Sequence, residues 1–173
     1  MMKKPALIVL LGKSGSGKDT VLTHLLTKVK QDKITLDIAR LVTHTTRPQR
    51  PGEQNGVDYW YHTNDEFQKM KDAGQVLEFR SYPVAGGPWY YWTAAEPLTH
   101  DATITISTLD GLHALQTYYG EKANIFAFYV DTAYGRRMKR AISREGKAPN
   151  YEEICRRFIA DEADFSEEKL LAA

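Results

Sequence analysis

A glycine-rich segment between two apolar stretches limits what this chain can fold into. Residues 12–20 read Gly-Lys-Ser-Gly-Ser-Gly-Lys-Asp-Thr, between the apolar run 6–11 and the helical pattern of residues 21–29. In this setting the glycines let consecutive backbone N–H groups turn toward an anion, and the following helix N-terminus adds partial positive charge. The segment therefore predicts a loop that binds the phosphates of a nucleotide, with a simple glycine-rich connector as the alternative.

The loop follows the pattern G-x-x-x-x-G-K-[ST] with one departure. Lys18 is expected to reach the outer phosphates, but Asp19 stands where serine or threonine is usual, and Thr20 comes next. The residues expected to bind phosphate are Gly12, Ser14, Gly15, Ser16, Gly17, Lys18, Asp19 and Thr20.

Bulk properties exclude several classes of protein. The net charge of the 173 residues is +1, so neither nucleic acid nor a membrane is an expected partner. The single cysteine, Cys155, excludes an internal disulfide framework, and the five histidines show no metal-ligand spacing. The N-terminal apolar run is too short for a signal sequence, so we expect a cytoplasmic protein.

Strand and helix patterns alternate over most of the chain. Strands are expected at 6–11, 38–42, 103–107 and 125–130, and helices at 18–30, at 132–144 with Thr132 as its cap, and from 150 onwards. This alternation predicts an α/β fold, with a three-layer core on a parallel sheet and the phosphate loop at the carboxyl edge of that sheet.

An aromatic stretch, residues 43–96, interrupts this alternation. It contains strand patterns at 57–61, 76–82 and 89–93 and a capping-box helix start at 63–66. We expect an inserted mixed or antiparallel lobe here, with Trp60 and Trp89 in its core. The expected organisation is a single domain, 1–173, with its core at about 1–42 and 97–173, the lobe at about 43–96 and a short mobile lid at about 144–151.

The start of this stretch suits a second phosphate. Arg47 and Arg50 lie three residues apart in a loop with two prolines, and a guanidinium fork matches phosphate oxygens. The hydroxyls of Thr43, Thr45, Thr46 and Tyr59 could complete such a site. A solvated surface loop is the alternative interpretation.

These segments together resemble the guanylate kinase family. Residues 43–59, T-H-T-T-R-P-Q-R-P-G-E-x-x-G-x-D-Y, are similar to the family's nucleoside-monophosphate loop, S-x-T-T-R-x-x-R-x-G-E-x-x-G-x-D-Y. Residues 65–78 resemble its helix ending in G-x-(F/V)-L-E, and residues 89–93, W-Y-Y-W-T, resemble its N-Y-Y-G-(S/T). With the phosphate loop and the basic segment 136–157, the similarity covers about residues 5–165.

The resemblance implies roles for individual residues. Arg47, Arg50, Tyr59 and Tyr91 match residues that hold the acceptor monophosphate, and Thr43, Glu78 and Thr93 match those that contact the guanine edge. A carboxylate that accepts from the guanine N1–H and N2–H₂ groups discriminates against adenine. On local sequence alone, Glu78 would be a solvated strand residue.

The basic segment matches the family's lid. Arg140, Arg144 and Arg157 align with arginines that stabilise the charge of the transferring phosphoryl group, and we assign them and Lys18 to catalysis. A solvated helix face is the alternative for such a run of charges.

Three departures from the family stand out. The acidic D-x-D after the strand 103–107 is missing, with Thr108 near the second acid, so the candidates for the Mg²⁺ shell are Asp19, Thr20 and Asp110. Trp92 replaces a glycine and could reshape the base pocket. Family members usually continue into another strand and helix, which implies a shortened member.

The expected activity is phosphoryl transfer from ATP to GMP or dGMP, giving ADP and GDP with Mg²⁺ as cofactor, in a monomer or homodimer. Two alternatives remain: a related kinase for ribose bisphosphate, and a non-catalytic guanylate-kinase-like binding module.

Overall fold

The chain forms two sheets and six helices within the residues that the computed structural model describes, 4–84, 86–146 and 148–172. The strands are β1 (Ala6–Leu11), β2 (Ile38–Arg40), β3 (His44–Thr45), β4 (Trp60–Tyr61), β5 (Val76–Tyr82), β6 (Trp89–Ala94), β7 (Ala102–Ile106) and β8 (Asn124–Tyr129). The helices are α1 (Lys18–Gln31), α2 (Asn64–Asp72), α3 (Leu109–Tyr119), α4 (Tyr134–Arg144), α5 (Tyr151–Asp164) and α6 (Glu167–Ala172).

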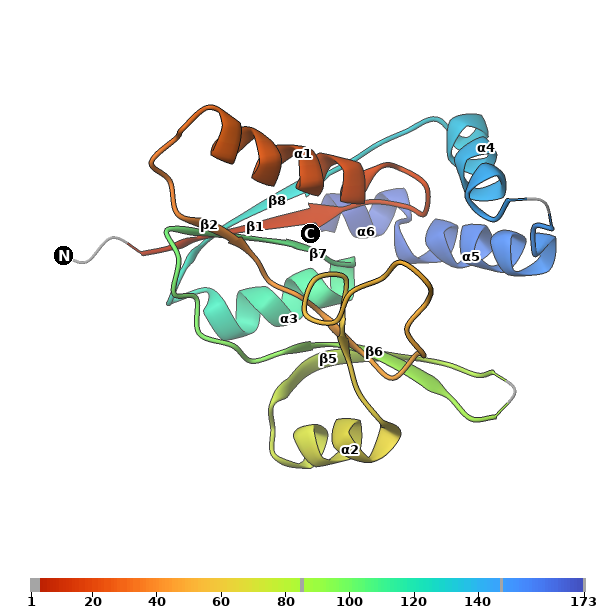
Figure 1. The fold of residues 1–173 in the computed structure, drawn as a ribbon, viewed down its shortest axis with the longest axis horizontal. Helices are drawn as coiled ribbons and strands as arrows, with labels where there is room; N and C mark the ends of the chain where they lie inside the picture. Colours follow the sequence, from red (N-terminus) through yellow and green to blue (C-terminus); the bar gives the residue numbers. More distant parts are fainter. Residues whose placement is uncertain (1–3, 85, 147, 173) are drawn as a thin grey trace.

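The larger sheet is parallel, with strand order β2-β7-β1-β8. Ala6 of β1 lies beside both Ala102 of β7 and Asn124 of β8, so these three strands start at the same level. Their carboxyl ends therefore meet at one edge of the sheet. The glycine-rich loop leaves β1 at this edge, and α4 and α5 lie beyond it (Figure 1).

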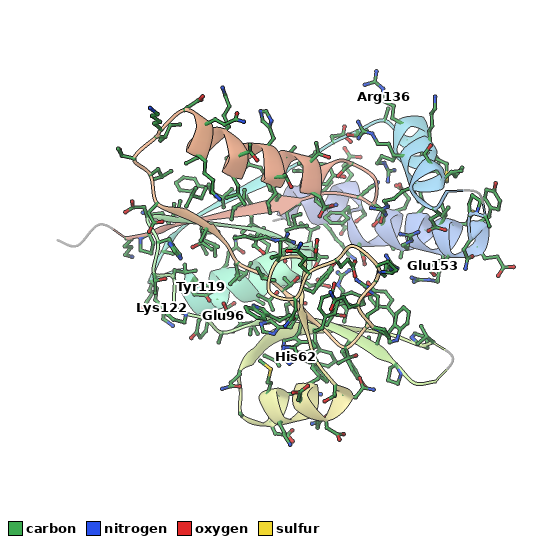
Figure 2. The ribbon with its side chains drawn as sticks, viewed as in Figure 1. His62, Glu96, Tyr119, Lys122, Arg136 and Glu153 are labelled. Atoms are coloured by element: carbon green, nitrogen blue, oxygen red, sulfur yellow. The ribbon has the colours of Figure 1, made fainter. Side chains whose placement is uncertain are left out.

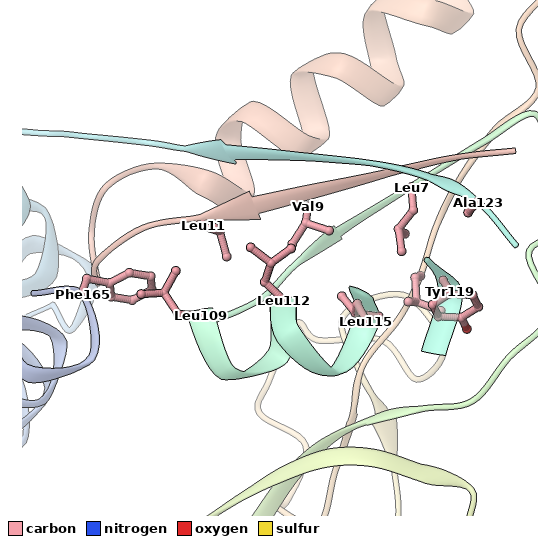
Figure 3. Close-up of a cluster of buried hydrophobic side chains, with 10 residues drawn as sticks. Leu7, Val9, Leu11, Leu109, Leu112, Leu115, Tyr119, Ala123 and Phe165 are labelled. Atoms are coloured by element: carbon pink, nitrogen blue, oxygen red, sulfur yellow. The ribbon is translucent and has the colours of Figure 1, made fainter. Parts of the chain in front are cut away.

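Helices cover both faces of this sheet, because all of β1 is apolar and its side chains alternate between the faces. Leu7, Val9 and Leu11 point to one side and pack with Leu112 of α3 (Figure 3). Leu10 points to the other side and packs in a second cluster with α1. These two clusters produce the predicted three-layer α/β core.

The second sheet is mixed, with strand order β4-β3-β6-β5. Strand β6 is antiparallel to β3 and to β5, whereas β3 and β4 are parallel. Helix α2 packs on one face of this sheet, and it begins with the predicted capping box, in which Thr63 and Glu66 exchange hydrogen bonds (Figure 1). The predicted mixed lobe is thus confirmed as a separate sheet.

The strand predicted at 57–61 is much shorter in the structure. Only Trp60 and Tyr61 pair in the sheet, because residues before them form a turn in which Gly56 has a φ of 75°. Trp60 packs over this glycine at the surface and is 39% exposed, so the prediction that it belongs to the core was wrong. Trp89 is half-buried.

Two predictions for the C-terminal helices also need correction. Ala133, not Thr132, is the N-cap of α4, because the Thr132 hydroxyl donates to the Ser16 carbonyl of the phosphate loop instead. The last helical pattern is divided into α5 and α6 at Phe165. The predicted lid, 144–151, includes Lys147, which lies outside the described residues. No helix in the described part of the chain is long and apolar enough to cross a membrane.

Candidate functional site

The glycine-rich loop has a backbone that requires glycine. Gly12, Gly15 and Gly17 have φ angles of 142°, 75° and 104°, which side-chain-bearing residues rarely adopt. A Cβ atom on Gly12 would lie 2.7 Å from the Val130 carbonyl oxygen, and one on Gly15 would lie 2.7 Å from the Arg137 carbonyl oxygen. The backbones of Val130 and Arg137 therefore lie too close to the loop for a side chain at Gly12 or Gly15. Glycine at such positions is what an anion-binding loop requires.

The side chain of Lys18 is hydrogen-bonded to the backbone of the loop that precedes it. Its Nζ atom donates to the carbonyl oxygens of Gly12, at 2.6 Å, and Lys13, at 3.2 Å. Burial lowers the pKa of Lys18. The ammonium group is thus held at the centre of the loop, where phosphate oxygens would replace the carbonyl contacts.

Arginines of α4 lie against the same loop. The Arg140 Nη1 atom donates to the carbonyl oxygens of Gly15 and Ser16, at 3.2 and 3.1 Å. Arg144, in the last turn of α4, adds positive charge near Lys18. Arg157 instead pairs with Glu145, with its Nη2 atom 2.7 Å from the carboxylate. The structure therefore brings Arg140 into contact with the loop, leaves Arg144 one turn further along α4 and pairs Arg157 with its own neighbours.

Sequence reasoning missed Arg137, which lies one helical turn before Arg140. Its side chain is buried, with the guanidinium carbon 5.0 Å from the centre of the Phe158 ring. It pairs with Glu162 at 3.1 Å and lies 3.9 Å from Asp161, both on α5. The signal was the i, i+3 spacing to Arg140, which places both arginines on neighbouring parts of one helix surface.

A cavity of about 60 Å³ lies at the carboxyl edge of the parallel sheet, beside the start of α1. Its walls come from α1, from the carboxyl ends of β2 and β7, from Thr43 and from Tyr59 at the end of the arginine-rich loop, residues 46–59. The lining residues are Asp19, Arg40, Leu41, Thr43, Tyr59, Thr105 and Ile106. Residues predicted for the two nucleotides therefore meet in one cavity.

The two faces of the second sheet differ in chemistry. One face carries Phe79, Tyr90 and Trp92, which pack with Phe67 of α2. The other carries the alternate residues of β5 and β6, which are Glu78, Arg80, Tyr82, Tyr91 and Thr93. Strand alternation thus places three of the predicted acceptor-binding residues, Glu78, Tyr91 and Thr93, on one polar face.

Glu78 and Thr93 are partners on this face. The Thr93 hydroxyl donates to Glu78 Oε1 at 2.8 Å, across neighbouring positions of the antiparallel pair. Burial raises the pKa of Glu78, and the Thr93 hydrogen bond opposes this rise. The Glu78 carboxyl group is therefore sheltered from water and held by Thr93 on the polar face of the sheet.

Arg47 lies among aromatic rings near the same face. Its guanidinium carbon is 5.6 Å from the centre of the Tyr59 ring, and the rings of Tyr59 and Tyr91 are 5.8 Å apart. Its Nη2 atom donates to both oxygens of Glu53, at 2.8 and 3.0 Å. Arg47, Tyr59 and Tyr91 therefore converge as predicted, whereas Arg50 is exposed.

Glu53 was not among the predicted site residues, although it belongs to the matched loop. Burial alone would raise the pKa of Glu53, but hydrogen bonds from Arg47, from the Arg50 backbone and from Tyr61 lower it to about 2. Burial and the bond to Glu53 in turn raise the pKa of Tyr61 to about 12. Glu53 thus holds Arg47 and Arg50 in one loop conformation.

Comparison with known proteins agrees with this geometry. A family model described as Guanylate kinase matches residues 4–167. The chain belongs to the guanylate kinase family. Two guanylate kinases of Streptococcus pyogenes, from serotypes M3 and M18, are each 40% identical to it over 100 residues. That match covers 58% of this chain and 42% of each relative, so it spans less than half of their length.

A solved guanylate kinase supports the fold. The crystal structure of the enzyme from Anaplasma phagocytophilum has a TM-score of 0.57 and 21% sequence identity, and the alignment covers 98% of this chain and 91% of that one. At this level of identity the likeness concerns the arrangement of strands and helices.

The structure shows where the side chains lie at two of the three departures from the family pattern, Trp92 and the missing acids. Trp92 is 1% exposed and packs on the α2 face, opposite Thr93, so the expectation that it could reshape the base pocket was wrong. The Thr108 hydroxyl accepts from the Gly111 N–H and serves as the N-cap of α3. Asp110 lies beside Arg80, 3.6 Å from its Nη2 atom, and does not line the cavity that contains Asp19.

Proposed function

We propose that this protein transfers the γ-phosphoryl group of ATP to GMP or dGMP, giving ADP and GDP or dGDP. The observation that carries the proposal is the Glu78–Thr93 pair on the same polar face as Tyr91, beside Arg47 and Tyr59. A carboxylate can accept hydrogen bonds from the N1–H and N2–H₂ groups of guanine, and adenine lacks this donor pair. The guanidinium and the tyrosine hydroxyls suit the monophosphate.

The donor side supplies positive charge where phosphoryl transfer needs it. Lys18 and the loop amides would bind the ATP phosphates, and Arg140 and Arg144 would offset the charge of the transferring group. An oxygen of the acceptor phosphate forms a bond to the γ-phosphorus while the bond to the β,γ-bridging oxygen breaks, and ADP leaves with that electron pair. The acceptor phosphate is already ionised, so no general base is required.

The chain offers a fitting place for the Mg²⁺ that accompanies ATP in this family. Asp19 and Thr20 are exposed at the start of α1, next to Lys18, and provide the oxygen ligands that Mg²⁺ prefers. Among the described residues there is no group of three or more His, Cys, Asp or Glu side chains that could hold a metal, which suits an ion held mainly through the nucleotide phosphates. When bound, Mg²⁺ neutralises charge on the phosphate oxygens.

A panel of acceptors tests this function. The purified protein, with ATP and Mg²⁺, is assayed for ADP formation with GMP, dGMP, AMP, CMP, UMP and a ribose bisphosphate. We expect turnover with GMP or dGMP to exceed that with every other acceptor. Preference for the ribose bisphosphate would assign the related kinase activity instead. ATP binding without turnover of any acceptor would favour the non-catalytic binding module.

A further inference from the structure

Arg80 connects the polar face of the second sheet to two helices. It follows Glu78 by two residues on β5, so both side chains project from the same face of the strand. Its Nη1 atom donates to Asp164 of α5 at 3.0 Å, and its Nη2 atom lies 3.6 Å from Asp110 of α3. One side chain thus ties β5 to elements that flank the parallel sheet.

The negative charges around residue 80 favour a positively charged side chain at this position. Glu78, Asp110 and Asp164 place three carboxylates around a single guanidinium. Arg80 favours the ionised form of Glu78, whereas Asp110 opposes it. The side chains of Arg80 and Asp164 are only 25% and 33% exposed, so water screens this pair less than it screens a surface pair.

The position of Arg80 separates it from the donor site. It does not line the cavity that contains Asp19, and its charged partners lie on α3 and α5 rather than in the glycine-rich loop. A change at Arg80 should therefore act on the acceptor without removing any contact to the ATP phosphates.

We propose that Arg80 is a positioning residue for the acceptor base: by bridging Asp164 and Asp110, it fixes β5 so that the Glu78 carboxylate faces the guanine edge. This inference rests on the proposed function, because it assigns to Arg80 a role at the guanine-binding carboxylate. Its ligand class is a purine nucleotide with adjacent N–H donors on its base.

Steady-state kinetics of Arg80→Gln, Arg80→Lys and Asp164→Asn test the proposal. We expect Arg80→Gln to raise KM for GMP about tenfold, with KM for ATP and kcat changed less than about twofold. Arg80→Lys keeps the charge but loses the planar fork, so it should recover part of this loss. Asp164→Asn should raise KM for GMP in the same selective way, and the double variant should be no worse than Arg80→Gln alone.

Arg136→Gln is the matched control, because Arg136 points into solvent from α4 and its replacement removes the same charge (Figure 2). It should leave both KM values unchanged. The proposal is overturned if Arg80→Gln keeps the wild-type KM for GMP, or if it raises KM for ATP and GMP equally. Should Arg80→Gln fail to fold, Arg80→Lys and Asp164→Asn decide by the same criteria.

The activity of the wild-type protein distinguishes a failure of the role of Arg80 from a failure of the proposed function. Wild-type turnover of GMP with an unaffected Arg80→Gln variant would refute the role of Arg80 alone. A wild-type protein that does not phosphorylate GMP or dGMP would refute the proposed function, and the role of Arg80 with it.

Discussion

The carboxylate of Asp161 on α5 accepts a hydrogen bond from the backbone N–H of Ser14 in the glycine-rich loop, with 2.6 Å between N and Oδ2. The next residue, Glu162, pairs with Lys13 of the same loop and with Arg137 of α4. Hydrogen bonds to an ionised acceptor are short and strong. Helix α5 therefore holds the first half of the loop in place before any nucleotide binds.

Replacing Asp161 should weaken the folded state measurably. We expect Asp161→Ala to lower the free energy of unfolding by about 1–3 kcal/mol, because the Ser14 N–H loses its acceptor. Asp161→Asn keeps an acceptor oxygen and should lose less. Urea denaturation of the two variants and the wild type provides the measurement. Equal stability of all three proteins would show that this contact contributes nothing.

Removal of the Lys18 ammonium should strongly slow the proposed phosphoryl transfer while preserving the fold. We expect Lys18→Met to lower kcat by roughly 10²-fold or more, because the developing charge on the phosphates loses its nearest cation. ATP binding, measured by calorimetry, should weaken as well. Lys28→Met, which removes an exposed lysine of the same helix, is the control. Wild-type turnover by Lys18→Met would contradict a role for this lysine in the reaction.

Protonation of Glu53 at low pH should weaken the contacts that hold the arginine-rich loop, residues 46–59. Its pKa falls from 4.5 to about 2 in the folded protein, so its stabilisation is complete above pH 4.5 and is lost as the pH falls toward 2. We expect Glu53→Gln to destabilise the protein at neutral pH by about 1–3 kcal/mol, because Arg47 loses a charged partner. The difference in free energy of unfolding between the variant and the wild type should shrink as the pH falls below 4.5 and should close only near pH 2. Urea denaturation of both proteins across this pH range provides the measurement. If the difference in their free energy of unfolding stays constant with pH, Glu53 is not the titrating group.

A histidine pair of the second sheet, His44 on β3 and His62 just after β4, should add a separate pH dependence. His44 Nδ1 lies 2.9 Å from His62 Nε2, and the other side of His44 faces Glu96 at 3.2 Å. Burial, and then the nearby His44, lower the pKa of His62 from 6.5, while Glu66 at 3.9 Å opposes this. The neutral ring is thus favoured by folding, so its stabilisation is complete above pH 6.5 and is lost as the pH falls through the lowered pKa.

The variant His62→Gln isolates this effect, because glutamine can hydrogen-bond but does not titrate. We expect stability to change less steeply with pH between about 6.5 and 5 in the variant than in the wild type. Unfolding by urea at several pH values in this interval is the measurement. Identical slopes in the two proteins would assign the pH dependence to other groups.

Much of the fold could be predicted because its determinants are local. The loop glycines, the continuous apolar runs and the Thr63–Glu66 capping box each specify structure within a few residues, and all three occur as predicted. The predicted acceptor residues converge because β5 and β6 pair in a register that places Glu78 beside Thr93.

The rest depends on contacts between distant residues. Ser14 and Asp161 are 147 positions apart, and nothing near either residue in the sequence indicates their pairing. The aromatic run 57–61 has strong strand propensity, but the turn at Gly56 leaves Trp60 at the surface. The side chains of β6 alternate between the two faces of the sheet. Trp92 therefore points away from the site, although both of its neighbours point toward it.

The two-faced second sheet restricts how acceptor preference can diverge. Insertion or deletion of one residue in β5 would move Phe79 into the place of Glu78 and put charge against α2. New specificities can therefore be reached by replacing side chains at alternate positions, but not by changing the length of the strand. For protein engineering, the polar face of this sheet is a surface whose residues can be exchanged while α2 keeps its apolar support.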